Sequence, residues 1–149
     1  MKYGLILGVL SVVCLSGCQI LRPPKGISPV ARMMTVTGYC RCGECCSWHR
    51  TWYGRPVYSS GAYKGKRKRV GMTASGSMAR KGTIAADTSI YPMKTIMYIE
   101  GYGYGRVEDR GGKIRGEIID LYFPTHQQAQ DWGRQEDKVV DVWFLNKKQ

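Results

Sequence analysis

Short apolar runs alternate with glycine-rich turns along most of the chain after residue 32. Runs of this kind, rich in Val, Ile, Thr and Tyr and bounded by turn residues, predict β-strands. Residues 125–133 predict a short helix, because Thr125 can cap its start and Gly133 can end it. About six strands and one short helix predict a mainly β fold, a small closed barrel. We expect strands over residues 33–39, 82–87, 95–100, 118–123 and 139–145, with a glycine-rich bend over 101–109.

One of these strands carries an acidic residue, Asp120, in an otherwise apolar run. Acidic side chains are disfavoured inside strands, and such local conflicts tend to mark functional sites. Alternate side chains of a strand share one face of the sheet. We expect one face to lie in the core, formed by Ile119, Leu121 and Phe123. We expect the other face to form the floor of a groove, with Ile118, Asp120 and Tyr122.

The N-terminus predicts export and a lipid anchor. Lys2 precedes an uncharged apolar stretch over residues 3–17, which is too short for a stable transmembrane helix and fits a leader peptide. It ends in Leu15-Ser16-Gly17-Cys18, which resembles the bacterial lipobox. That resemblance implies cleavage before Cys18, diacylglycerol on its sulfur and acylation of its new amine. An ordinary secretory signal with an incidental cysteine is the alternative.

The sequence predicts three parts of the chain. Residues 1–17 are a lipoprotein signal peptide, and residues 18–32, which contain three prolines after the cysteine, are the lipid anchor and a tether. Residues 33–149 form the domain, with a cysteine cluster at 40–46 and a basic loop at 47–70. We expect an envelope protein that faces the periplasm, anchored in the outer membrane rather than the inner, because Gln19 is not the aspartate associated with inner-membrane retention.

Composition supports a globular domain and adds a strong positive charge. Hydrophobic residues make up 43% of the chain and aromatic residues 11%, which excludes a disordered chain. Lys and Arg number 23 against 11 Asp and Glu, a net charge of +12 that implies anionic surroundings. We interpret the basic residues at 64–69 as a solvated surface that can contact anionic wall polymer or lipid headgroups. Aromatic and basic residues together also fit single-stranded nucleic acid, but an exported protein rarely meets it, so we expect no nucleic-acid partner.

Four of the six cysteines lie within seven residues: Cys40, Cys42, Cys45 and Cys46. An oxidising compartment favours two disulfides, Cys40–Cys45 with Cys42–Cys46 or Cys40–Cys46 with Cys42–Cys45. A four-thiolate structural zinc site is the rival interpretation, in which His49 could replace one ligand. The cluster therefore indicates a local cross-link, and the sequence does not decide whether disulfides or a metal ion form it.

The second half of the chain contains, in unbroken order, the segments Thr73–Gly76, Gly82–Asp87, Ile99–Gly103, Glu108–Gly116, Ile119–Phe123 and Ala129–Gly133. Together these segments resemble the three-aspartate (3D) domain family. This double-psi β-barrel is shared with membrane-bound lytic transglycosylase A and with stationary-phase survival wall lytic enzymes. One turn departs from the family, because Lys94 stands in Pro92-Met93-Lys94-Thr95 where a glycine is usual. The large substrate-clamping domain of the transglycosylase has no counterpart in this chain.

The resemblance implies non-hydrolytic cleavage of the β-1,4 bond between N-acetylmuramic acid and N-acetylglucosamine in peptidoglycan. Its catalytic aspartates would be Asp120 as general acid and then base, with Asp109 and Asp87 tuning its proton and orienting sugar. An ordinary Asp is ionised above about pH 4, so burial or a neighbouring carboxylate must raise the pKa of the acid. Tyr102, Tyr104 and Tyr122 are candidate sugar-stacking residues.

Other readings of these residues remain. Asp87 and Asp109 could simply cap turns, and the whole domain could bind the cell wall as a non-catalytic scaffold that uses the same groove. We expect a monomer, no cofactor for catalysis, and peptidoglycan and the membrane as partners.

Overall fold

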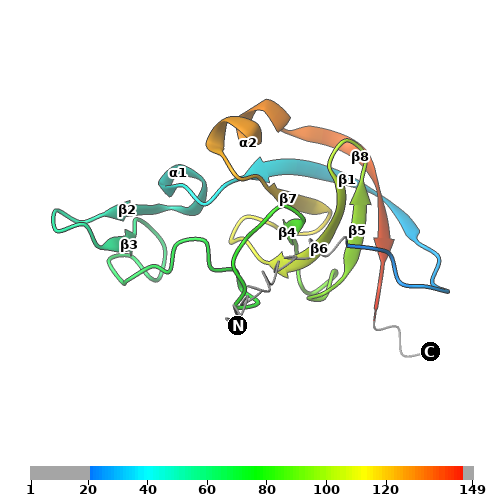
Figure 1. The fold of residues 1–149 in the computed structure, drawn as a ribbon, viewed down its shortest axis with the longest axis horizontal. Coiled ribbons are helices and arrows are strands. Elements are labelled where there is room, and N and C mark those ends of the chain that lie inside the picture. Colours follow the sequence, from blue (N-terminus) through cyan, green and yellow to red (C-terminus); the bar gives the residue numbers. More distant parts are fainter. Residues whose placement is uncertain (1–20, 146–149) are drawn as a thin grey trace, which may run out of the picture.

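Six strands close into a barrel in the order β1-β7-β4-β6-β5-β8 (Figure 1). The structure is a computed structural model that describes residues 21–145. Strands β1 and β7 pair in parallel, as do β4 and β6, and the other neighbours are antiparallel. This mixed six-stranded barrel confirms the mainly β prediction and agrees with a small double-psi barrel. The barrel strands are β1 Val30–Tyr39, β4 Thr83–Ala85, β5 Ile96–Ile99, β6 Gly103–Asp109, β7 Ile118–Tyr122 and β8 Gln135–Trp143.

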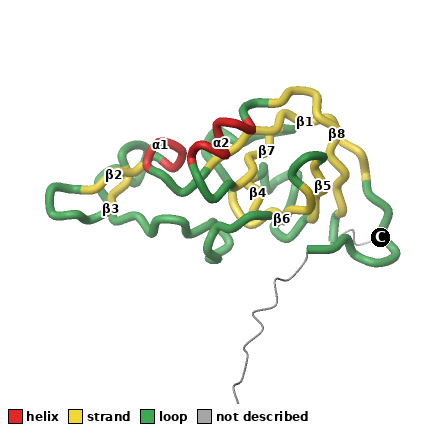
Figure 2. Tube along the Cα trace, turned by 45° about the horizontal axis from the view of Figure 1, so that its top comes forward, coloured by secondary structure: helices red, strands yellow, loops and turns green. Residues whose placement is uncertain are grey.

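A smaller unit projects from one side of the barrel (Figures 1 and 2). It consists of helix α1 (Gly43–Cys46) and a two-stranded sheet of β2 (Trp48–Arg50) and β3 (Pro56–Tyr58). The sequence predicted a loop over residues 47–70. This prediction was wrong where β2 and β3 pair as an antiparallel hairpin. The prediction of one helix also has to be corrected, because α1 and α2 (His126–Trp132) are both present. We call residues 40–70 the projecting segment.

Two strands begin earlier than the sequence predicted. β1 starts at Val30, inside the expected tether, and β8 starts at Gln135 rather than near residue 139. The two strands pair with each other from Val30↔Val142 to Val36↔Gln135, so each supplies the ladder hydrogen bonds of the other. The expected bend at residues 101–109 is largely strand β6, which pairs with β5 and β4.

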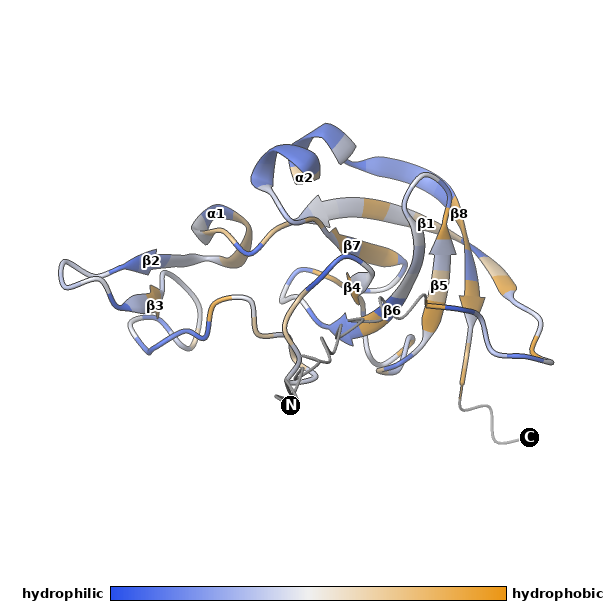
Figure 3. Ribbon diagram, viewed as in Figure 1, coloured by the Kyte–Doolittle hydropathy of each residue, from blue (hydrophilic) through white to orange (hydrophobic). Residues whose placement is uncertain are grey.

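The barrel interior holds the apolar face that alternation predicted. Ile119 and Leu121 of β7 are fully buried in the main core, and Phe123 packs against it. Tyr122 points to the other side, into a small cluster with Tyr39 and Ala85. Figure 3 shows apolar residues gathered on the barrel strands, whereas α2 and the first half of β8 are hydrophilic. The predicted core face of β7 is therefore confirmed, whereas only Asp120 and Tyr122 of the opposite face line a groove, and Ile118 does not.

Helix α2 lies against β1 because Gly38 carries no side chain. A Cβ atom at Gly38 would lie 2.9 Å from the carbonyl oxygen of Ala129 in α2, closer than real Cβ atoms approach. The predicted caps are present: the Thr125 hydroxyl accepts from the backbone N–H of Gln128, and Gly133 ends the helix with φ 66°. This packing fixes where His126, the first residue of α2, lies relative to the end of β1.

The predicted signal peptide at residues 1–17 and the lipidation site Cys18 lie outside the described residues, so they stay predictions. Among residues 21–145, no helix is long and apolar enough to cross a bilayer.

Candidate functional site

Four side-chain positions form one row across three adjacent strand pairs. Thr37 of β1 pairs with Asp120 of β7, Asp120 pairs with Ala85 of β4, and Ala85 pairs with Asp109 of β6. Paired residues of neighbouring strands place their side chains side by side. Asp120 and Asp109 therefore face the same surface, with the small side chain of Ala85 between them.

A β-bulge in β6 brings Asp109 into this row. The register between β4 and β6 shifts from Ile84↔Val107 to Ala85↔Asp109, so Glu108 is the extra residue. Bulges re-aim side chains and are common beside active sites. Glu108 itself is buried and is held by hydrogen bonds and ion pairs from three side chains, those of Thr83, Arg80 and Arg106.

Three hydrogen bonds fix the carboxylate of Asp109. Its Oδ1 atom accepts from the backbone N–H groups of Ala74 and Arg110, both at 2.9 Å. Its Oδ2 atom accepts from the hydroxyl of Tyr39 at 3.3 Å. Burial, followed by the charges of Asp109 and Asp120, raises the pKa of Tyr39 well above its usual range, so this hydroxyl stays a donor. Asp109 is thus oriented by its turn and also faces the groove.

Asp120 is the carboxyl group with the environment of a general acid. Burial raises its pKa from the ordinary 3.8 to about 6, and the nearby charge of Asp109 adds to the rise. The hydroxyl of Thr37 donates to Oδ1 of Asp120 at 2.9 Å and opposes the shift. A carboxyl group with such a pKa is protonated in about one molecule in ten at pH 7, far more often than an ordinary Asp, so it can donate a proton.

Both aspartates lie in a groove of about 820 Å³ between the barrel and the projecting segment. Tyr122 and Tyr39 lie beside Asp120, with their rings edge to face at 5.5 Å. Tyr58 and Tyr63 line the groove from the projecting segment, and Tyr63 is 60% exposed. Five cationic residues also line it, namely Arg41, Arg67, Lys68, Arg69 and Arg110. The groove therefore combines two carboxyl groups with a basic, aromatic rim.

Asp87 does not line this groove. Its Oδ1 atom accepts from the hydroxyl and backbone N–H of Ser89, and its Oδ2 atom accepts from the backbone N–H of Gly116. These hydrogen bonds lower its pKa. Asp87 therefore ties two turns together, which corrects the expectation that it acts on the proton of Asp120.

Two of the three tyrosines expected to stack on sugar lie elsewhere. Tyr102 is 8% exposed in the main core, and its hydroxyl donates to the carbonyl of Tyr122 at 2.8 Å. Tyr104 lies outside the groove, against Tyr98 and Trp143. Tyr122 does line the groove, but it is only 5% exposed, so little of its ring can meet a ligand.

The four clustered cysteines divide into three and one. All four are free thiols, so the predicted disulfides are not formed. The sulfur atoms of Cys40, Cys42 and Cys45 converge on His126, which the sequence did not single out. Cys46 faces the groove instead, and its thiol donates to the carbonyl of Cys40. Burial raises the pKa of Cys46 to about 11, which disfavours the thiolate form that acts as a nucleophile.

Sequence reasoning missed Tyr39, Thr37 and Ala85, the neighbours that complete the row. The alternation in the Val36–Tyr39 segment could have placed Thr37 and Tyr39 on one face. Their closeness to Asp109 and Asp120, however, depends on the parallel pairing of β1 with β7. Nothing in the sequence gives that pairing.

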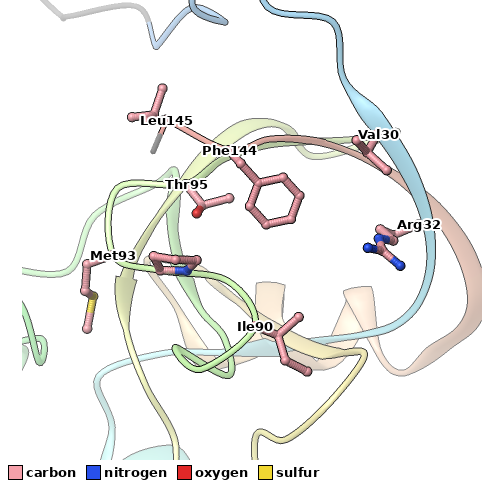
Figure 4. A pocket seen from close by; sticks show the side chains of 8 residues that line it. Val30, Arg32, Ile90, Met93, Thr95, Phe144 and Leu145 are labelled. Carbon is pink, nitrogen blue, oxygen red and sulfur yellow. The ribbon is translucent and has the colours of Figure 1, made fainter. Parts of the chain in front are cut away.

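A second cavity at the barrel, of about 250 Å³, has a different character (Figure 4). Its lining is apolar apart from Arg32 and Thr95, with Phe144, Ile90 and Met93 around it. It contains no carboxyl group or other acid–base pair, so the groove with Asp120 is the better candidate for chemistry.

Comparisons with known proteins found two relatives whose names refer to the cell wall. The chain is 38% identical over 80 residues to the cell wall-binding protein YocH of Bacillus subtilis. It is 38% identical over 63 residues to the putative cell wall shaping protein YabE of the same organism. The alignments cover 51% and 42% of this chain but 27% and 15% of those relatives, so the chain spans about a quarter or less of their length.

Two crystal structures of MltA from Escherichia coli, one of them described as revealing a unique lytic transglycosylase fold, also match. They are 19% identical, with TM-scores of 0.39 and 0.40, over 52% and 54% of this chain and 29% and 30% of theirs. A family model, that of the 3D domain, matches residues 82–146. This span contains Asp87, Asp109 and Asp120 in the order the resemblance predicted, and we conclude that residues 82–146 of the chain are a 3D domain.

Proposed function

We propose that this protein binds peptidoglycan and cleaves its glycan strands as a lytic transglycosylase, with Asp120 as the general acid and then the general base. The observation that carries the proposal is the half-buried carboxyl of Asp120, with a pKa of about 6, in a groove it shares with Asp109. The match to a cell wall-binding relative supports the substrate class.

One carboxyl group can perform both proton transfers. Asp120 donates its proton to the glycosidic oxygen as the bond from that oxygen to C1 of N-acetylmuramic acid breaks. The C6 hydroxyl of the same sugar then bonds to C1, and the Asp120 carboxylate accepts the hydroxyl proton. The product is a 1,6-anhydro sugar, no water is consumed, and the acid is regenerated. A structural zinc ion at the cysteine cluster is compatible with this reaction, which draws only on Asp120.

Asp109 and its partners have a supporting role in this proposal. Its negative charge favours the protonated form of Asp120, as like charges do when two carboxyl groups share a site. The hydroxyl of Tyr39 and two backbone N–H groups hold it in place. Asp87 holds a turn and has no part in the reaction.

The rim of the groove suits an anionic glycan. Arg67, Lys68 and Arg69 can pair with the carboxylates that peptidoglycan carries on its lactyl groups and peptides. Tyr58 and Tyr63 lie with ring centroids 5.7 Å apart. Lys68 Nζ lies 4.3 Å from the centroid of the Tyr58 ring, whereas Tyr63 is 60% exposed and has more ring surface for a sugar. We therefore assign sugar stacking to Tyr63 in place of Tyr102 and Tyr104.

Location follows from the substrate. We infer that the protein works in the cell envelope, and that acyl chains on Cys18 hold it to the outer membrane with the domain in the periplasm. A lipid anchor with more than one chain gives stable membrane attachment. Membrane fractionation of the wild type and of Cys18→Ala tests this inference, because the variant should leave the membrane fraction.

Binding without cleavage is the second candidate function. It is favoured by the name of the relative YocH, a cell wall-binding protein, and by the basic rim, which can bind glycan without any reaction. In this case the domain would act as a scaffold that holds the wall.

Digestion of purified sacculi separates the two functions. The wild type should release muropeptides with anhydro ends, detected by mass spectrometry, while Asp120→Asn should release about a hundred-fold less or none and still co-sediment with sacculi. Wild-type protein that co-sediments but releases no anhydro product would leave only the binding function. Equal digestion by Asp120→Asn would show that another group is the acid.

A further inference from the structure

Three cysteines and one histidine converge at the junction of the barrel and the projecting segment. Cys40 follows β1, Cys42 caps α1 and Cys45 lies within it, while His126 begins α2 more than 80 residues later. Their ligand atoms all lie within 4.8 Å of one another. The chain thus brings four metal-binding side chains from two distant segments to one point.

The separations fit a tetrahedral metal ion. With zinc–sulfur bonds of about 2.3 Å and zinc–nitrogen bonds of about 2.0 Å, tetrahedral angles place ligand atoms about 3.5 to 3.8 Å apart. The sulfur atoms of Cys42 and Cys45 each lie 3.4 Å from Nδ1 of His126, and that of Cys40 lies 3.9 Å from it. The sulfur atoms of Cys40 and Cys45 are 3.8 Å apart.

The surrounding groups prepare these atoms to bind a cation. Nε2 of His126 lies 3.1 Å from the carboxylate of Glu44, which fixes the tautomer that leaves Nδ1 free for a metal. The backbone N–H of Cys42 donates to the sulfur of Cys40, and that of Cys45 donates to the sulfur of Cys42. Such N–H groups stabilise negative charge on thiolates.

The fourth cysteine shows that the cluster is selective. Cys46 adjoins Cys45 in sequence, yet its thiol turns away and donates to the carbonyl of Cys40 at 3.2 Å. His49, the histidine nearest in sequence, instead contacts the hydroxyl of Ser59 at 2.8 Å. The set is therefore three thiolates and one imidazole, rather than the four thiolates or two disulfides that the sequence allows.

We propose that Cys40, Cys42, Cys45 and His126 bind a structural zinc ion that fastens the projecting segment to the barrel. Thiolate and imidazole ligands in a tetrahedron select zinc, and four protein ligands leave no position for substrate, as in closed structural sites. The ion would join α1 to the start of α2 and hold Cys46, Tyr58 and Tyr63 along one wall of the groove. The ion would hold this wall of the groove in a fixed position and takes no part in proton transfer.

Metal analysis of the purified protein tests the site. Protein prepared without chelators should contain one zinc ion per chain, as measured by inductively coupled plasma mass spectrometry. Replacement by cobalt should give a sulfur-to-cobalt charge-transfer band and the intense visible bands of a tetrahedral site. Cys42→Ser and His126→Ala should lose the zinc and lower the melting temperature. The matched controls, Cys46→Ser and His49→Ala, should keep both.

Several results would overturn the proposal. Zinc-free wild-type protein whose intact mass shows two disulfides would replace the metal site by a covalent staple. Retention of zinc by His126→Ala, with loss by Cys46→Ser, would establish a four-cysteine site instead. Zinc-loaded protein that releases no anhydro product contradicts only the proposed catalysis, and active protein without zinc contradicts only the metal site.

Discussion

Asp109 and Asp120 are both paired with Ala85, one from each neighbouring strand. Neighbouring strands lie about 4.8 Å apart, so the backbones of the two aspartates are separated by about 10 Å and their side chains approach each other above a methyl group. This arrangement keeps the charge of Asp109 near enough to influence the pKa of Asp120.

Enlarging the residue between the carboxyl groups should therefore block the site. Ala85→Val adds two methyl groups at the centre of the row, and small displacements of a substrate have large effects on rate. We expect release of anhydro-muropeptides to fall roughly ten- to a hundred-fold. Ala85→Gly is the matched control: it keeps the space and should keep the rate, at a stability cost of about 1 kcal/mol. Equal rates for Val and wild type would mean that substrate does not enter between the aspartates.

The rate of cleavage should depend on the protonation of Asp120. A general acid must be protonated, so kcat/KM should fall about tenfold per pH unit above the pKa of about 6. Asp109→Asn removes a negative charge that favours the protonated form, so its descending limb should lie at lower pH than that of the wild type. Initial rates of anhydro-product release across a pH series give the descending limb for each protein. If the limbs of the wild type and Asp109→Asn coincide, Asp109 does not influence the pKa of Asp120.

Asp120 should also reduce stability at neutral pH. Its pKa rises from 3.8 to about 6 on folding, so the folded protein binds the proton more tightly than the unfolded chain does. The resulting stabilisation is complete below pH 3.8 and is lost as the pH rises through about 6. The asparagine in Asp120→Asn does not ionise, so this variant has no such loss of stability as the pH rises. Near pH 8 its free energy of unfolding should therefore exceed that of the wild type by roughly 1 to 2 kcal/mol. Urea unfolding near pH 4 and near pH 8 measures this difference, which should vanish at the lower pH. A variant that is less stable at both pH values would contradict it.

The basic run at residues 64–69 contains charged residues that line the groove and others that do not. Arg67 and Arg69 line the groove, whereas Lys64 and Lys66 do not. Replacing the two arginines by alanine should weaken co-sedimentation with sacculi roughly five-fold or more, because each exposed ion pair contributes up to about 1 kcal/mol. The same change at the two lysines alters net charge equally and should have a smaller effect. Because Lys66 Nζ lies 5.5 Å from the centroid of the groove-lining Tyr63 ring, Lys64→Ala alone is compared with Arg67→Ala alone as a second control. Equal losses from both pairs would indicate general attraction to an anionic wall rather than binding in the groove.

The sequence predicted the barrel and set Asp120 apart from the core residues of its strand, but it did not predict the arrangement around Asp120. Alternation in β7 was enough to separate Ile119 and Leu121 from Asp120, because it depends only on local geometry. His126 was missed as a neighbour of the cysteines because its approach depends on α2 packing over Gly38. Asp87 was assigned to the wrong task because family order says nothing about hydrogen bonds such as the one from Gly116.

The turn that departs from the family pattern provides a last prediction. The backbone N–H of Thr95 donates to the carbonyl of Pro92, so Lys94 is the third residue of a tight turn, where it adopts φ 78°. A left-handed conformation costs a residue with a Cβ atom roughly 1 kcal/mol relative to glycine. Lys94 is exposed, so its side chain offers little in return. Lys94→Gly should therefore stabilise the protein by about 1 kcal/mol in urea unfolding, while the control Lys94→Ala, which keeps the strain, should not. Equal stabilisation by Ala would show that charge, rather than backbone conformation, is what this position disfavours.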